Sequence, residues 1–171
     1  MEYFQKIKSP VGMLTVSCDG ENITGLWIEG QKYFANGLEK NAEEKKFPVL
    51  EKAQNWLDLY FSGKKPDIKL NFLPKGTPYQ KSIWNILQKI PYGKTVTYGE
   101  IASQYKIKNG GKQTSARAVG AAVGKNPISI FIPCHRVIGK DGSLTGYAGG
   151  LSKKTLLLQI EGININDKYH S

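Results

Sequence analysis

Short apolar runs separated by turn-forming polar residues occupy the beginning of the chain, and this pattern predicts β-strands. We expect strands over residues 4–8, 13–18 and 23–29. The segment 19–22 reads Asp-Gly-Glu-Asn, which supplies the glycine and small polar residues that a tight hairpin needs. The chain is therefore expected to open with a strand followed by an antiparallel hairpin.

A helical spacing replaces this pattern between residues 49 and 61, where apolar residues recur every third or fourth position. Gly63 follows as a C-cap. A last short strand is expected around residues 68–72. These elements predict a small α/β domain over residues 1–73, and no residue in it suggests chemistry.

Three helical patterns follow in the second part of the chain, which we assign to one domain over residues 74–171. They cover residues 78–90, 98–105 and 115–124, and a threonine stands where it can cap each of the first two. A basic, glycine-containing connection over residues 106–113 separates the last two. The second domain is therefore expected to be mainly helical.

The third helical pattern has one face built from small residues, on which Arg117 is the single long side chain. Thr114, Ala121 and Gly124 share that face. Three helices with such a third member suggest a helix-turn-helix that binds DNA. A helical subdomain whose small residues only allow close packing fits the pattern equally well.

The charge balance favours a polyanionic partner. The chain of 171 residues carries 24 Lys and Arg against 14 Asp and Glu, a formal net charge of +10. Many basic proteins never bind nucleic acid, so the charge supports DNA binding only together with a motif.

The cysteines and histidines are too few for a disulfide framework or a metal site. The cysteines are Cys18 and Cys134, the histidines are His135 and His170, and no metal-ligand spacing occurs. No cofactor is indicated. No long apolar run or signal peptide is evident. We expect a cytoplasmic protein, associated with the nucleoid when on DNA, or a nuclear one if the source is eukaryotic.

Cys134 is the candidate nucleophile. It follows a buried-looking strand expected over residues 128–132, and His135 and Arg136 come directly after it. Nearby positive charge lowers the pKa of a thiol, and the thiolate is the reactive form. The alternative is a small apolar core residue, which is our interpretation of Cys18.

Several motifs around Cys134 resemble those of the O6-alkylguanine-DNA alkyltransferases (methylated-DNA–protein-cysteine methyltransferases). The resemblance is close from about Thr77 to Gly162 and thin over residues 1–72. The Pro-Cys-His-Arg-Val pentapeptide is its most specific part. The motifs are Thr114–Gly120, Asn126-Pro127, Ile130–Gly139, Gly142–Leu151 and Leu157–Glu161.

The resemblance implies a two-part fold. The first part would be an α/β unit of ribonuclease-H-like shape without that activity. The second would be a mainly helical domain with a winged-helix-like helix-turn-helix that holds the active site. The chain departs from some relatives in its long loop 106–113, and it lacks the zinc site of some animal members.

The resemblance also implies a mechanism. The damaged nucleotide turns out of the duplex into a pocket, and Arg117 takes its place in the stack. Cys134 attacks the alkyl carbon after His135, held by Glu161, takes the thiol proton through a water. Tyr98 donates a hydrogen bond to N3 of the leaving guanine. The alkylated cysteine is not regenerated, so each molecule reacts once.

Further roles follow from the same resemblance. The partner is double-stranded DNA containing alkylated guanine, with O4-alkylthymine as a second possible lesion, and the protein is expected to be a monomer that binds no membrane. The expected DNA contacts are Thr114, Ser115, Arg117, Asn126 and Arg136. The expected pocket residues are Val137, Tyr147, Ala148 and Gly149.

Three other functions remain as alternatives. A lesion-binding protein of this fold would lack the cysteine, whereas Cys134 is present. A DNA-binding regulator would use the helix-turn-helix and leave Cys134 without a role. A thiol hydrolase would turn over an acyl or peptide substrate.

Overall fold

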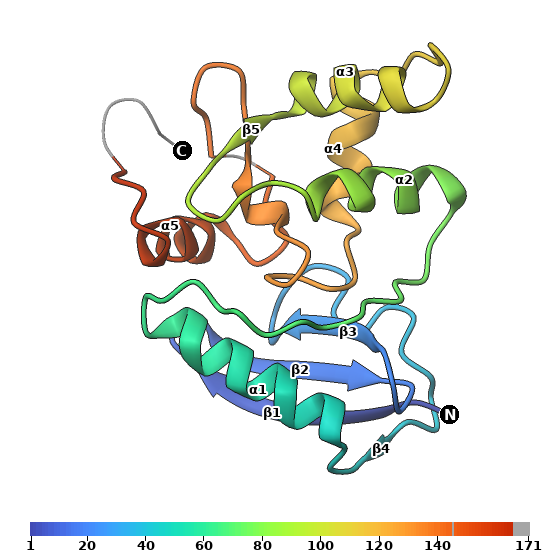
Figure 1. The fold of residues 1–171 in the computed structure, drawn as a ribbon, viewed down its shortest axis with the longest axis vertical. Coiled ribbons are helices and arrows are strands. Elements are labelled where there is room, and N and C mark those ends of the chain that lie inside the picture. The colour runs from blue at the N-terminus through green and yellow to red at the C-terminus, as the bar shows by residue number, and fades with distance from the viewer. Residues whose placement is uncertain (145, 166–171) are drawn as a thin grey trace.

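The computed structural model describes residues 1–144 and 146–165 of the chain. A β-sheet with one helix forms its first part, and helices joined by loops form its second part (Figure 1). The elements of the first part are β1 (Tyr3–Ser9), β2 (Gly12–Cys18), β3 (Ile23–Ile28), β4 (Glu43–Glu44) and α1 (Pro48–Phe61). Those of the second part are α2 (Pro78–Leu87), β5 (Val96–Thr97), α3 (Tyr98–Lys108), α4 (Ala116–Gly124), the short 3₁₀ helix η1 (Cys134–Arg136), β6 (Val137–Ile138) and α5 (Leu151–Ile160).

The three strands predicted at the beginning of the chain are confirmed as β1, β2 and β3. They pair antiparallel, and the sheet order is β3-β2-β1-β4 with β4 parallel to β1. The Asp19 carboxylate closes the turn between β2 and β3, because it accepts hydrogen bonds from the N–H groups of Glu21 (2.9 Å) and Asn22 (2.7 Å). The two-residue strand β4 has no alternating pattern that could have predicted it.

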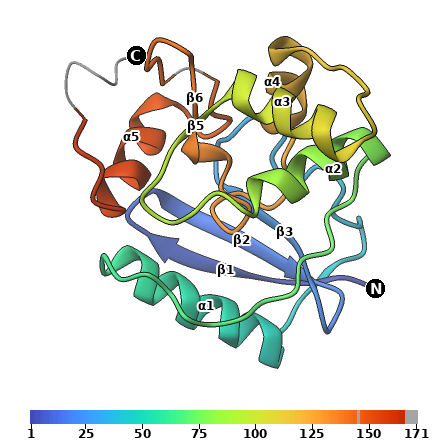
Figure 2. The same cartoon turned by 45° about the horizontal axis from the view of Figure 1, so that its top comes forward.

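The predicted helix before Gly63 is confirmed as α1. Pro48 stands in its first turn, where a missing N–H costs nothing. The helix packs along one face of the sheet (Figure 2). It buries Leu50, Ala53, Leu57 and Tyr60, which lie on one side at helical spacing.

The edge of β3 that faces away from β2 connects the two parts of the molecule. Ile23 forms a parallel bridge with Phe72, and Leu26 forms one with Ile128. The strand predicted over 68–72 is therefore wrong apart from Phe72, because only the end of that segment reaches the sheet. Pairing of β3 with segments from both sides of the boundary leaves the second part beside this edge (Figure 1).

The three predicted helices of the second part are confirmed as α2, α3 and α4, which pack against one another. Thr77 and Thr97 cap the first two in complete capping boxes. The third begins one residue later than expected, because the Ser115 hydroxyl accepts a hydrogen bond from the N–H of Ala118 and so occupies the cap position. Helix α3 continues to Lys108, so the basic connection is shorter than predicted.

One hydrophobic core runs through both parts. It includes Leu26 and Tyr60 from the first part and Trp84, Ile101 and Leu157 from the second. The halves are therefore stabilised together rather than as independent units. In the part of the chain that the structure describes, no helix is long and apolar enough to cross a membrane.

Candidate active site

A turn built around the side chain of Asn126 leads the chain to Cys134. The Asn126 Nδ2 donates to the carbonyl of Ile132 (2.8 Å), and its Oδ1 accepts from the N–H of Ile128 (3.0 Å). A buried amide that bonds backbone groups in this way competes with strand formation. The strand predicted over 128–132 is therefore wrong: its apolar residues are buried, but they form a closed turn.

The backbone of this turn is strained at one position. Ile130 has a φ of 71°, in the left-handed region that a β-branched residue rarely adopts. The N–H of Phe131 bonds the carbonyl of Ser129, and the N–H of Cys134 bonds that of Ile132, both at 2.8 Å. Dense packing holds this conformation, and such strain is found often at functional sites.

Cys134 is the first residue of η1 and is 5% exposed. Burial raises the pKa of its thiol above the ordinary value, and neither the hydrogen bond from Asn126 nor the charge of Lys154 reverses that effect. The charge of Lys154 does lower this pKa, but burial outweighs it, so the expectation of a net lowered pKa is wrong. At rest the sulfur is therefore protonated, and it needs a base before it can attack.

His135 and Glu161 form a buried pair beside this cysteine. The His135 Nε2 lies 2.5 Å from Glu161 Oε2, and both side chains are inaccessible to solvent. Burial lowers the pKa of His135 below its ordinary value, against the opposing effect of the Glu161 carboxylate. The imidazole is therefore neutral near pH 7 and can accept a proton.

The free nitrogen of this imidazole is Nδ1. It is buried and makes no hydrogen bond to any group in the part of the chain that the structure describes. With Nε2 donating to the carboxylate, Nδ1 carries the lone pair. His135 is therefore held in the tautomer that a base needs.

The Glu161 carboxylate receives donors on both oxygens. Oε1 accepts from Arg136 Nε (2.8 Å) and the N–H of Gly93 (2.9 Å), and Oε2 accepts from His135 and the Tyr60 hydroxyl (2.6 Å). Burial alone would raise the pKa of this carboxyl, but the hydrogen bond from His135, the charge that His135 carries once it is protonated at low pH, and the charge of Arg136 lower it to about 2. Glu161 is therefore a carboxylate at every physiological pH.

Two polar residues of this site were missed by sequence reasoning. Tyr60 belongs to α1, in the part to which no chemistry was assigned. Lys154 of α5 is 1% exposed, and its ammonium donates to the carbonyl of Val137 at 2.5 Å. Burial lowers the pKa of Lys154 to about 8, although the Cys134 sulfur opposes this. The sequence signal that could have identified both residues is a polar group among the apolar positions of a helix. Such a group is buried with them and therefore needs a buried hydrogen-bond partner.

Tyr98 reaches the site through a strand pairing. Strand β5 pairs parallel with β6, which follows Cys134 in the chain, and α3 begins directly after β5 with Tyr98. Burial raises the pKa of Tyr98 to about 12, and the nearby Cys134 adds to the effect. The phenol is therefore a proton donor at neutral pH, as the expected role at a leaving guanine requires.

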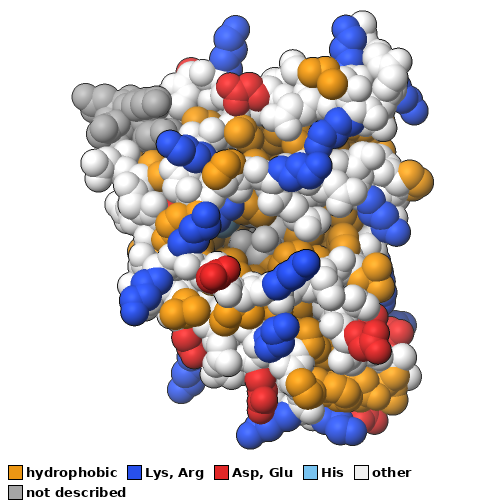
Figure 3. Space-filling view, viewed as in Figure 1, with side chains coloured by type: hydrophobic (Ala, Val, Ile, Leu, Met, Phe, Trp, Pro, Cys, Tyr) orange, Lys and Arg blue, Asp and Glu red, His pale blue; other side chains and the backbone are white. Residues whose placement is uncertain are grey.

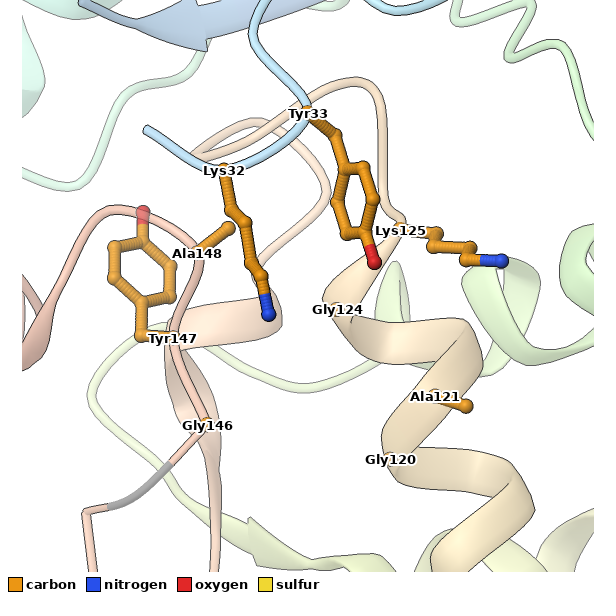
Figure 4. A pocket seen from close by; sticks show the side chains of 9 residues that line it. All are labelled: Lys32, Tyr33, Gly120, Ala121, Gly124, Lys125, Gly146, Tyr147 and Ala148. Atoms are coloured by element: carbon orange, nitrogen blue, oxygen red, sulfur yellow. The ribbon is translucent and has the colours of Figure 1, made fainter. Parts of the chain in front are cut away.

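A pocket of about 290 Å³ opens between α4, the segment after Gly146 and the loop after β3 (Figure 4). Its lining includes the small face of α4, together with Tyr147 and Ala148, which were expected there. Lys32 and Tyr33 of the first part were not expected; Figure 4 shows both side chains extending from the loop toward this space. The lining residues are Lys32, Tyr33, Gly120, Ala121, Gly124, Lys125, Gly146, Tyr147 and Ala148.

Backbone contacts fix the wall of this pocket. The N–H of Lys32 donates to the carbonyl of Ala148 (3.1 Å), which ties the first part to the pocket segment. A Cβ on Gly149 would stand 2.8 Å from the Tyr147 ring and 3.1 Å from Ile28, so only glycine fits there. Val137, also expected in the pocket, is fully buried in β6.

The five expected DNA contacts fall into two groups. Thr114, Ser115 and Arg117 lie at or near the start of α4, where Ser115 and Arg117 are exposed and Thr114 bonds the hydroxyl of Tyr79 (2.6 Å). Asn126 and Arg136 are 4% and 7% exposed, and their side chains bond protein groups instead. We therefore interpret these two as internal supports of the site.

No group of three or more potential metal ligands occurs among residues 1–144 and 146–165.

Comparisons with known proteins agree over nearly the whole chain. The family model described as "6-O-methylguanine DNA methyltransferase, ribonuclease-like domain" matches residues 3–74, and that described as "6-O-methylguanine DNA methyltransferase, DNA binding domain" matches residues 78–163. The ribonuclease-like and DNA-binding parts that the resemblance implied are therefore confirmed.

Individual proteins are similar over comparable lengths. The methylated-DNA–protein-cysteine methyltransferase of Haemophilus influenzae is 43% identical over 167 residues, covering 97% of this chain and 89% of that protein. The constitutive methylated-DNA–protein-cysteine methyltransferase of Bacillus subtilis is 38% identical, covering 98% of this chain and 100% of its own length. The crystal structure of Mycobacterium tuberculosis OGT in complex with DNA superimposes with a TM-score of 0.81 at 36% identity, covering 99% of this chain and 96% of that one.

Proposed function

This chain belongs to the 6-O-methylguanine DNA methyltransferase family, and on that premise we propose that it repairs alkylated DNA by moving the alkyl group from O6 of guanine to the sulfur of Cys134. One observation carries the proposal. A buried cysteine is followed in the chain by a neutral histidine whose Nε2 is held by a carboxylate and whose Nδ1 makes no hydrogen bond within the described residues. This is the arrangement of an activated nucleophile.

The transfer itself moves one proton and one alkyl group. The Cys134 thiol gives its proton to His135 Nδ1 through a water, and the thiolate attacks the alkyl carbon in line. A carbon–sulfur bond forms while the carbon–O6 bond breaks, and the electron pair of that bond leaves with the guanine. Glu161 stabilises the imidazolium that forms, since its carboxylate stays charged.

The guanine departs as an anion, so a proton donor near it lowers the barrier. Tyr98 is the candidate donor, and we propose that it donates to N3 of the base. Its raised pKa keeps the phenol protonated before transfer. The pocket beside α4 is the space in which we place the turned-out nucleotide, with Tyr147 and Ala148 at its wall.

The DNA-binding part would engage the duplex through a winged-helix-like helix-turn-helix in which α4 is the recognition helix. Its small exposed face allows close approach to a groove, and Arg117 is the long side chain that can enter the stack. Double-stranded DNA bearing O6-alkylguanine is the proposed substrate, and O4-alkylthymine is a second candidate. We further propose a monomer that works in the cytoplasm, on the nucleoid, or in the nucleus of a eukaryote.

Each molecule is expected to react once. The product is a thioether, which has no good leaving group. The second cysteine, Cys18, is fully buried in β2, so it offers no exchange partner. The protein is consumed in proportion to the lesions that it repairs.

The direct test is the covalent product. The protein is incubated with duplex DNA containing O6-methylguanine, digested, and analysed by mass spectrometry. We expect one methyl group on the peptide that contains Cys134 and none on the peptide that contains Cys18. Tight binding without methylation would indicate a lesion-binding protein, sequence-specific binding of undamaged DNA would indicate a regulator, and catalytic turnover of a thioester would indicate a hydrolase.

A further inference from the structure

Tyr60 brings a hydroxyl from the ribonuclease-like part into the middle of the active site. It lies near the end of α1 and is fully buried. Its hydroxyl donates to Glu161 Oε2 at 2.6 Å, with His135 Nε2 at 3.2 Å and the carbonyl of Leu157 at 3.4 Å. The residue and its carboxylate partner are 101 positions apart in the chain.

The ring of Tyr60 is held by packing that does not involve this hydroxyl. Trp56 stacks on it with centroids 5.3 Å apart, and Phe61 and Tyr92 meet it edge-on at 5.3 and 6.2 Å. A phenylalanine would make the same ring contacts. A tyrosine at this position therefore adds one hydroxyl, and that hydroxyl faces the catalytic pair.

The hydroxyl acts as a donor at every accessible pH. Burial and the Glu161 charge raise its pKa far above the ordinary value, although Arg136 opposes this. A phenol has one proton to give, and Oε2 is the nearest of its acceptors. A bond of this length to a charged acceptor is a strong one.

Both Glu161 oxygens are then occupied by two donors each, counting Arg136, Gly93, His135 and Tyr60. A carboxylate has about four lone-pair sites, so the set is complete and the group cannot turn without breaking a bond. Oε2 is the oxygen that holds His135, and Tyr60 is its other strong donor. The geometry of the base therefore depends on a residue of the other part of the molecule.

We propose that Tyr60 is a positioning residue for alkyl transfer, which fixes Glu161 Oε2 so that His135 stays in the Nε2–H tautomer and remains neutral. The proposal rests on the function proposed above and extends it to the ribonuclease-like part. Donation by Tyr60 spreads the negative charge of the carboxylate. The imidazolium is then stabilised less, and His135 stays a free base at lower pH.

The direction in which a substitution at Tyr60 shifts the pKa of His135 follows from the charges around the imidazole. Arg136 and Lys154 disfavour the imidazolium, Glu161 favours it, and none of them is changed by a substitution at Tyr60. In Tyr60→Phe the carboxylate keeps more of its charge toward His135, so the pKa of His135 should rise. A ring-fluorinated tyrosine at position 60 is a stronger donor and should lower this pKa.

The pKa of His135 can be measured without any activity. The chain contains two histidines, so an NMR titration yields two imidazole curves that His170→Gln assigns. We expect the curve of His135 to move up in Tyr60→Phe and down in the fluorinated protein. Unchanged curves in both would overturn the proposal, whether or not the wild type transfers alkyl groups.

Single-turnover rates with free O6-benzylguanine supply the second readout. The acid limb of the rate–pH profile should shift with the titration, and the plateau rate of Tyr60→Phe should fall about tenfold. The matched control is Tyr92→Phe, which loses a hydroxyl that donates to the carbonyl of Ile160 (3.4 Å) and not to Glu161. A uniform loss of rate with no shift, or an equal shift in the control, would reduce Tyr60 to a structural role.

The two proposals fail in different ways. No alkyl transfer by the wild type, with the titration shifts still present, would refute the proposed function alone. Normal transfer by the wild type with an unshifted Tyr60→Phe would refute the role of Tyr60 alone. Because Tyr60 acts through Glu161, Tyr60→Phe should add little further loss in a Glu161→Gln background.

Discussion

At the scale of single residues, burial decides the charge states of this site. The same desolvation that keeps the Cys134 thiol protonated also keeps His135 neutral. Glu161 is buried too, yet it accepts four hydrogen bonds, and the donors His135, Arg136 and Gly93 hold it as a carboxylate. The result is a thiol that needs a base to take its proton before it can attack.

The first prediction at this scale concerns the two cysteines. Cys134→Ser should abolish transfer and leave DNA binding intact, since a hydroxyl is far harder to ionise than a thiol with an ordinary pKa of ~8.5. Cys18→Ser is the control and should transfer at the wild-type rate. Mass spectrometry and a gel-shift assay measure the two properties. Repair by Cys134→Ser at a near-native rate would contradict the assignment.

The second prediction concerns stability at low pH. The pKa of Glu161 falls from 4.5 to about 2 on folding, so the unfolded chain binds the proton more readily. The stability from this group is therefore present above pH 4.5 and is lost as pH falls toward 2, with a total of about 3 kcal/mol. Glu161→Gln cannot titrate and should show a flatter decline. Urea unfolding at several pH values between 6 and 3 measures how the free energy of unfolding changes with pH in the wild type and in Glu161→Gln. The prediction requires that the two slopes differ.

At the scale of elements, short contacts place the functional side chains. The parallel pairing of β5 with β6 brings Tyr98 beside the segment of Cys134. The Tyr98 ring also lies 3.7 Å from where a Cβ on Gly120 of α4 would stand. The small residues of α4 therefore line the pocket. The helix also has exposed positions at its start, which can approach DNA.

The prediction for α4 concerns Arg117, which is exposed at the start of the helix. If it replaces the turned-out nucleotide in the stack, Arg117→Ala should slow repair of duplex DNA strongly and barely change the reaction with free O6-benzylguanine. Unstacking costs on the order of a few kcal/mol, and each ~1.36 kcal/mol corresponds to a tenfold change in rate.

Single-turnover rates on both substrates test this prediction, with Lys52→Ala on the exposed side of α1 as a control for lost charge. Equal losses on both substrates would assign Arg117 to the pocket or the fold. No loss on either would make it a surface charge without a part in repair.

At the scale of the whole molecule, the net charge of +10 is spread widely. On the face of the molecule that is seen in the view of Figure 1, Figure 3 shows Lys and Arg side chains distributed over both parts, with fewer Asp and Glu among them. Such a distribution attracts DNA without selecting a sequence. Specificity for the lesion then has to come from the pocket.

The prediction at this scale is a strong dependence of DNA affinity on salt. Each phosphate neutralised contributes a slope of about −0.9 to the logarithm of affinity against the logarithm of salt concentration. Fluorescence anisotropy with undamaged duplexes of several sequences should yield similar slopes and affinities. An affinity that stays constant between low and physiological salt would contradict a binding mode based on phosphate contacts.

The sequence by itself predicted most of the longer elements and singled out Cys134 as the candidate nucleophile. Periodicity and capping residues are local signals, so β1 to β3 and α1 to α4 were predictable. The motif around Cys134 was equally local. A buried apolar run is compatible with more than one backbone conformation. For that reason the segment 128–132 was predicted as a strand and found as a turn.

The resemblance predicted that Glu161 holds His135, and only the tertiary structure decided which other groups meet there. Glu161 collects donors from Tyr60, Gly93, His135 and Arg136, which stand as many as 101 positions away in the chain. The chain has two arginines, and packing alone buries Arg136 against this carboxylate while Arg117 stays exposed. Hydrogen bonding and desolvation act through space, so neither can be read from spacing along the sequence.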